Sequence, residues 1–117
     1  MKAIICFDLD GVICLTKKNY YHLSRPIKKN IKKINFFFNK GFIIKIFTAR
    51  FMGRSKESVA LARSRGFNMT QRQLKKWGVR YHKLIFGKPS YDLFIDDKCI
   101  FFKKNWIDEI DKKIKKI

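Results

Sequence analysis

Short apolar runs alternate along this chain with longer segments in which apolar residues recur every three or four positions. A short run that stops at a turn residue is typical of a buried strand, whereas recurrence at helical spacing predicts an amphipathic helix. The expected strands are residues 3–8, 42–47, 84–86 and 91–95. The expected helices are residues 26–40, 55–65, 70–77 and a terminal helix after Asn105. This alternation predicts right-handed crossovers, and therefore an α/β fold with a parallel sheet flanked by helices.

Turn and cap residues mark the ends of the expected helices. Pro26 stands at a good first helical position and Gly41 at a C-terminal stop, while Thr70 and Asn105 are candidate N-caps. The terminal helix is expected to bury one apolar face, made of Trp106, Ile107, Ile110, Ile114 and Ile117. Residues 11–24 are polar and irregular, and we call this segment the flap.

Polar side chains follow the expected strands. Asp8 and Asp10 follow the first, Thr48 follows the second, Lys88 follows the third, and the Asp96-Asp97 pair follows the fourth. Ligands bind outside the carboxyl ends of the strands in an open parallel sheet. The sequence therefore predicts that carboxylates, a hydroxyl and an ammonium meet at one rim, which suits a magnesium ion and a phosphoryl group.

The order of these motifs resembles the haloacid dehalogenase (HAD) superfamily of phosphotransferases. That superfamily has Asp-x-Asp after its first strand, Thr or Ser after the second, Lys or Arg before the last core strand, and an acidic pair after it. Every element is present here in that order. Thr48-Ala49-Arg50, residues 73–79 and Gly87-Lys88-Pro89 are also similar to small capless phosphatases often associated with capsule and lipopolysaccharide sugar pathways.

The resemblance implies a three-layer, Rossmann-like domain and a role for each motif residue. Asp8 is the expected nucleophile, and Asp10 the expected acid and base. Thr48 and Lys88 are expected to bind the phosphoryl group, with Ala49 and Arg50 beside the substrate. Asp8, the Asp10 carbonyl, Asp96 and Asp97 would supply oxygen ligands to Mg²⁺, and which residue of the acidic pair binds directly stays open.

Two other classes of protein share part of this pattern. A phosphoacceptor receiver domain also uses an acidic pair, a Thr and a Lys, but its acidic pair comes first, whereas here Asp96-Asp97 follows Lys88. A catalytically idle binding module of the same fold should have lost a motif residue, and none is lost. We therefore expect a magnesium-dependent phosphomonoester hydrolase.

The chain length limits the architecture. Residues 1–117 are expected to form one domain, and the intervals on either side of Thr48 are too short for the cap domains of this superfamily. The site should then be open, covered only by the flap or by a second copy of the chain. Self-association is expected for that reason.

Net charge of +19 raises the question of a nucleic-acid substrate, such as a polynucleotide end. The basic residues are spread over every expected helix, so we interpret the charge as composition bias and favour a small phosphorylated metabolite, with a nucleotide or polynucleotide end as the alternative.

No apolar run approaches the length of a membrane span. Cys6, Cys14 and Cys99 lack metal-ligand spacing, and reduced thiols are expected in a cytoplasmic protein.

Overall fold

A parallel three-stranded sheet forms the centre of the computed structural model, which describes residues 3–115. The strands are β1 (Ile4–Asp8), β4 (Ile43–Thr48) and β5 (Lys83–Phe86), in the order β1-β4-β5. Ile46 is opposite Phe7 on β1 and Leu84 on β5, so the three strands end at one rim. The predicted α/β class with a parallel sheet is confirmed.

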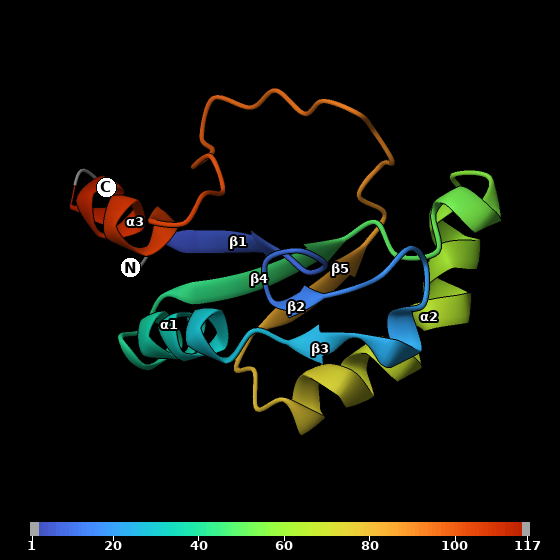
Figure 1. Ribbon diagram of the computed structural model, residues 1–117, viewed down its shortest axis with the longest axis horizontal. Helices are drawn as coiled ribbons and strands as arrows, with labels where there is room; N and C mark the ends of the chain where they lie inside the picture. Colours follow the sequence, from blue (N-terminus) through green and yellow to red (C-terminus); the bar gives the residue numbers. More distant parts are fainter. Residues whose placement is uncertain (1–2, 116–117) are drawn as a thin grey trace.

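Three α-helices flank this sheet (Figure 1). Helix α1 (Lys28–Asn39) packs against β4, and α2 (Val59–Lys76) packs against β5. Helix α3 (Trp106–Ile114) returns to β1 and α1: the indole of Trp106 lies edge-on to Phe7 and donates a hydrogen bond to Asn30 at 3.3 Å. The expected apolar face of α3 is confirmed for Trp106 and Ile110, which are buried, while Ile117 lies outside the described residues.

The flap contains a small antiparallel hairpin. Strand β2 (Cys14–Leu15) pairs with β3 (Arg25–Pro26), and the 3-10 turn η1 (Tyr21–Leu23) lies between them. Pro26 is therefore in a strand and not at the first position of α1, which begins two residues later. The reason is that the Pro26 ring, which fixes φ, suits an extended strand end as well as a helix start.

The two helices expected at 55–65 and 70–77 are one continuous helix, α2, preceded by the 3-10 turn η2 (Gly53–Ser55). Gly66 lies inside this helix, at a position where an added Cβ would collide with the ring of Phe51. Thr70 is a buried residue inside the helix rather than its N-cap. Ser58 is the N-cap, and its Oγ accepts the Leu61 N–H at 3.3 Å.

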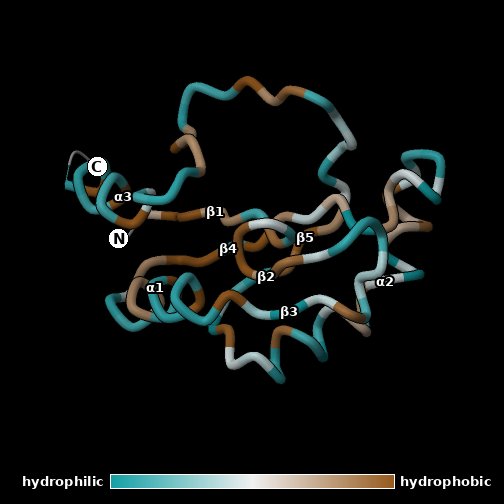
Figure 2. The backbone as a smooth tube through the Cα atoms, in the orientation of Figure 1, coloured by the Kyte–Doolittle hydropathy of each residue, from teal (hydrophilic) through white to brown (hydrophobic). Residues whose placement is uncertain are grey.

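The fourth strand expected at residues 91–95 is absent from the described part of the chain. Residues 87–105 instead form an extended segment that leaves β5 and arches back to α3 (Figures 1 and 2). Its apolar run is exposed: Leu93 is 78% and Ile95 87% accessible. An apolar run of this kind forms a strand only where a partner strand lies beside it. The local sequence pattern does not show whether such a partner is present.

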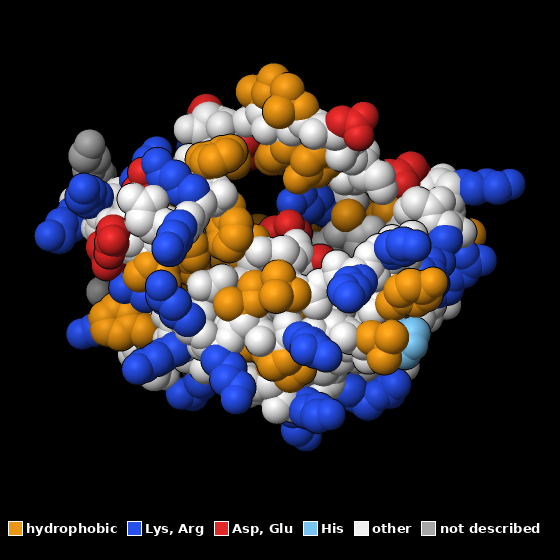
Figure 3. Space-filling model, in the orientation of Figure 1, with side chains coloured by type: hydrophobic (Ala, Val, Ile, Leu, Met, Phe, Trp, Pro, Cys, Tyr) orange, Lys and Arg blue, Asp and Glu red, His pale blue; other side chains and the backbone are white. Residues whose placement is uncertain are grey.

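Asn105 occupies the N-cap position of α3, as expected, but its side chain makes no capping hydrogen bond. In Figure 3 basic side chains are distributed along the lower part and both sides of the molecule rather than gathered in one patch, while the arch at the top shows mainly hydrophobic and acidic side chains. This distribution fits the interpretation of the charge as composition bias. None of the helices within residues 3–115 is both long and apolar enough to cross a membrane.

Candidate active site

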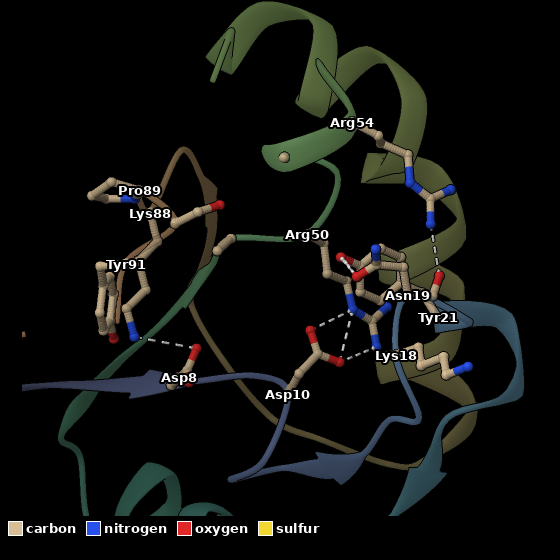
Figure 4. A pocket seen from close by; sticks show the side chains of 13 residues that line it. Asp8, Asp10, Lys18, Asn19, Tyr21, Arg50, Arg54, Lys88, Pro89 and Tyr91 are labelled. Atoms are coloured by element: carbon tan, nitrogen blue, oxygen red, sulfur yellow. Dashed lines mark hydrogen bonds and ion pairs between the residues drawn. The ribbon is translucent and has the colours of Figure 1, made fainter. Parts of the chain in front are cut away.

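The carboxyl ends of β1, β4 and β5 face the flap and η2 across a pocket of about 550 Å³ (Figure 4). Its charged lining residues are Asp8, Asp10, Lys18, Arg50, Arg54 and Lys88. Ala49 and Tyr91 also line it. The pocket is where the strand polarity of a parallel sheet predicts a ligand site.

Asp8 is the last residue of β1 and faces Lys88. Its Oδ1 accepts the Leu9 N–H at 2.9 Å and lies 3.5 Å from the Lys88 ammonium. Burial raises the pKa of the Asp8 carboxyl above its ordinary value, and Lys88 opposes this rise without cancelling it. The carboxylate is partly buried and lies beside the Lys88 ammonium at the rim of the sheet.

Lys88 is placed by the turn that follows β5. Gly87 has φ of 108°, a conformation that glycine adopts without strain, and the Lys88 N–H donates to the Thr48 carbonyl at 3.1 Å. Burial lowers the pKa of the Lys88 ammonium, but hydrogen bonds to Tyr91 and Asp8 and the Asp8 charge outweigh it, so the pKa lies above its usual value. Lys88 therefore stays charged and offers a fixed positive charge at the rim.

Asp10 is bound by Arg50, from the end of β4. The Arg50 Nε lies 3.1 and 3.0 Å from the two Asp10 carboxylate oxygens, and Nη2 lies 3.0 Å from Oδ1. Thr16 adds a hydroxyl hydrogen bond to Oδ1 at 2.6 Å. These bonds fix the orientation of both carboxylate oxygens of Asp10 at the pocket.

Arg50 is only 1% accessible, and its side chain makes further hydrogen bonds inside the protein. Its Nη1 donates to Thr70 and Gln73 of α2 at 3.2 and 2.6 Å, and its Nη2 donates to Ser24 of the flap at 3.2 Å. We call Arg50 and these partners, with Asp10, the Arg50 network. Sequence analysis placed Arg50 beside the substrate; in the structure it lines the pocket, but its hydrogen bonds go to Asp10, α2 and the flap.

Thr48 is completely buried, and its Oγ1 accepts the Arg50 N–H at 3.1 Å. It stands at the end of β4, as predicted, but it is not among the side chains that line the pocket. In this structure it shapes the turn that presents Ala49 and Arg50. Cys14, beside Asp10, is not a nucleophile candidate, because burial raises the pKa of its thiol to about 11.

Asp96 and Asp97 are not brought to the pocket. Both are exposed in the extended segment, where the Asp96 carboxylate accepts the Lys98 N–H at 2.8 Å. Within residues 3–115, no group of three or more His, Cys, Asp or Glu residues is placed to hold a metal ion. The predicted magnesium ligands therefore do not converge here, because the strand that was expected to carry the acidic pair to the rim is absent. Asp8 and Asp10, each paired with a cation, do not by themselves fit a magnesium site.

The flap residues Asn19 and Tyr21 line the pocket, as expected of a segment that covers the site, and Arg54 lines it as well. Gln73 was not expected here; it supports the pocket by donating to the Tyr21 carbonyl at 2.7 Å. The only signal in the sequence was that Thr70 and Gln73 lie on one face of a helix, three residues apart. Nothing in the sequence indicated that this face meets the rim.

No family model matches the chain, and no curated protein matches it. Among solved structures, the chain is similar to a crystal structure of a target protein from Vibrio cholerae, with a TM-score of 0.79, 24% identity, and coverage of 97% of this chain and 98% of that one. It is also similar to a chain in the structure of a Pnkp1/Rnl/Hen1 complex, with a TM-score of 0.52 and 18% identity. That match covers 93% of this chain and 32% of the other. At these identities the likenesses show the fold alone.

Proposed function

We propose that this protein is a phosphomonoester hydrolase of the HAD type that acts through an aspartyl-phosphate intermediate. One observation carries the proposal: Asp8, a partly buried carboxylate at the end of a parallel strand, faces the Lys88 ammonium at 3.5 Å, and the carboxylate of Asp10 lines the same pocket. Phosphoryl transfer needs these three parts, namely a nucleophile, a cation for the phosphoryl oxygens and a proton donor.

In the first step an Asp8 oxygen attacks phosphorus and forms an acyl-phosphate bond. The bond from phosphorus to the leaving oxygen breaks, its electron pair stays on that oxygen, and protonated Asp10 supplies the proton. In the second step Asp10 takes a proton from a water molecule as that water attacks phosphorus. The acyl-phosphate bond then breaks, which restores the Asp8 carboxylate and releases inorganic phosphate.

Lys88 provides electrostatic stabilisation in both steps. Its ammonium is placed to neutralise charge on the equatorial oxygens, and the Asp8 and Tyr91 contacts hold it there. The dependence on Mg²⁺ that the sequence resemblance implies stays a prediction, and we assign no step to the ion. The expected substrate is a small phosphorylated metabolite, such as a sugar or amino-alcohol phosphate of a surface-polysaccharide pathway.

Hydrolysis of para-nitrophenyl phosphate, with Mg²⁺ in the buffer, tests the proposal. The Asp8→Asn variant should lose at least about 10³-fold in kcat, because the amide cannot form the covalent intermediate. Asp92→Asn, which changes an exposed acid outside the pocket, is the matched control and should keep wild-type turnover. Circular dichroism should show that both variants are folded.

Rapid quenching and intact-mass measurement should detect a phosphorylated wild-type chain and no phosphorylated Asp8→Asn chain. Turnover by Asp8→Asn close to that of the wild type would refute the covalent mechanism. Absence of turnover by the wild type on every phosphomonoester tried would favour the idle binding module instead.

A further inference from the structure

The charges that line the pocket do not balance. Lys88 is paired with Asp8, and Arg50 is paired with Asp10. Lys18 and Arg54 also line the pocket, and no acidic side chain among its described lining residues is left to pair with them. The pocket therefore carries two more positive than negative charges before any ligand enters.

The two extra cations lie on the side of the pocket away from Asp8 and Lys88 (Figure 4). Arg54 comes from η2 and Lys18 from the flap, whereas Asp8 ends β1 and Lys88 follows β5. A phosphoryl group held between Asp8 and Lys88 would thus point its leaving group toward Lys18 and Arg54. Lys18 and Arg54 would therefore contact the leaving group of the substrate and not the phosphoryl group.

Arg54 is held in place for this role. Its guanidinium carbon lies 4.8 Å from the ring centroid of Phe51 and 5.4 Å from that of Tyr21. Its Nη2 donates to the Asn19 carbonyl at 2.8 Å, which binds η2 to the flap. A guanidinium has five N–H donors, so this single bond leaves a planar, stacked donor set that suits a phosphate or carboxylate.

We propose that Lys18 and Arg54 form a second anion subsite, and that the physiological substrate is a small phosphomonoester whose leaving group carries another negatively charged group, a phosphate or a carboxylate. This inference rests on the proposed function and names its substrate class. The pocket volume of about 550 Å³ is in the range of small-molecule sites. On the face shown in Figure 3 the basic side chains are not gathered in one patch, which supports a small substrate over a nucleic-acid strand.

A matched series of three-carbon phosphate esters tests the subsite. The esters end in a hydroxyl, a carboxylate or a second phosphate, and kcat/KM is measured for each at physiological salt. The wild type should prefer the two charged esters over the hydroxyl ester by about tenfold, counted per phosphate group, as expected for charge-assisted hydrogen bonds at a partly exposed site.

Lys18→Ala and Arg54→Ala should each reduce this preference severalfold, and the double variant should abolish it. The controls are Lys29→Ala on α1 and Arg72→Ala on α2, which remove exposed cations that do not line the pocket and should keep the wild-type preference. Because the readout is a ratio between substrates, a general loss of active protein does not mimic the expected result.

The outcomes distinguish failure of the second anion subsite from failure of the proposed phosphatase function. Hydrolysis of all three esters with equal kcat/KM would overturn the subsite and leave the phosphatase function standing. An unchanged preference in the double variant would also overturn the subsite. Preferential turnover of a 3′-phosphorylated oligonucleotide over the bisphosphate would overturn the small-substrate assignment. Hydrolysis of none of these esters and of no para-nitrophenyl phosphate would overturn the proposed function itself.

Discussion

The guanidinium of Arg50 is shared by three parts of the chain: the loop after β1, the flap and α2. It is fully desolvated, and it carries one formal charge that Asp10 compensates. Removing one partner of such a pair leaves an uncompensated charge in a place that water reaches poorly. The network thus stabilises the fold through the same contacts that orient the Asp10 carboxylate at the pocket.

Arg50→Ala should lower the free energy of unfolding by about 3–5 kcal/mol, the range for breaking one side of a buried ion pair. Arg50→Lys should recover only part of this loss, because an ammonium cannot reproduce the planar donor set. Urea denaturation followed by circular dichroism measures both. Arg72→Ala, an exposed arginine on α2, should change stability by less than about 0.5 kcal/mol. A loss of that small size for Arg50→Ala would show that the buried pair is not formed.

At the residue scale, the sequence predicted the residues that directly follow strands. Asp8, Asp10 and Lys88 line the pocket because strand polarity alone brings them to the rim. Lys18 lies in the segment expected to cover the site, but the sequence did not show that Lys18 and Arg54 line one pocket, since their place depends on how the flap and η2 fold against each other. Asp96 and Asp97 were misplaced for the same reason, because their position depended on a strand pairing.

At the element scale, α2 shows how a close contact overrides a local signal. Glycine inside a helix costs stability relative to alanine, and Gly66 falls between the two helices expected at 55–65 and 70–77. In the structure Gly66 is buried where α2 crosses the rings of Phe51 and Phe86. Its missing side chain is what allows the helix to approach the residues that follow β4.

Gly66→Ala should destabilise the protein by about 1–3 kcal/mol despite the better helix propensity of alanine, because overpacking must displace Phe51 or the helix. Gly53→Ala is the matched control: an added Cβ there meets no atom within 4 Å. Thermal unfolding of the two variants gives the comparison. A Tm for Gly66→Ala at or above that of the wild type would show that helix propensity outweighs the contact with Phe51.

The strand expected at 91–95 shows an element that the local sequence pattern predicted but that did not form. Its residues have the composition of a strand, yet strands are stabilised by partners that are distant in sequence. Ser90 is held instead by Glu57, whose carboxylate accepts the Ser90 N–H at 2.9 Å and its hydroxyl at 3.2 Å. Helices α1 and α3 were easier to predict, because their apolar periodicity is contained within each segment.

At the scale of the whole molecule, a highly charged surface coexists with an exposed apolar segment. The net charge of +19 opposes association at low salt. Leu93, Ile95 and Phe101 are nevertheless 78%, 87% and 78% accessible, which is costly for an isolated chain in water.

We expect the chain to self-associate through this segment. Sedimentation equilibrium at micromolar concentration and physiological salt should give a mass above the 14.0 kDa of one chain. The double variant Leu93→Ser, Ile95→Ser should shift the mass toward the monomer, while Lys29→Ala should not. A single monomeric species for the wild type would contradict this expectation.

The Arg50 network also bears on the order in which the molecule folds. Asp10 and Arg50 are 40 positions apart in the sequence, and Arg50 and Gln73 are 23 apart. Contacts that close long loops form only after the chain entropy of those loops has been lost, so they are late relative to local helical contacts. We therefore expect the Arg50 network to form near the end of folding, so that the Asp10 carboxylate is oriented only once the flap and α2 have docked against the rim of the sheet.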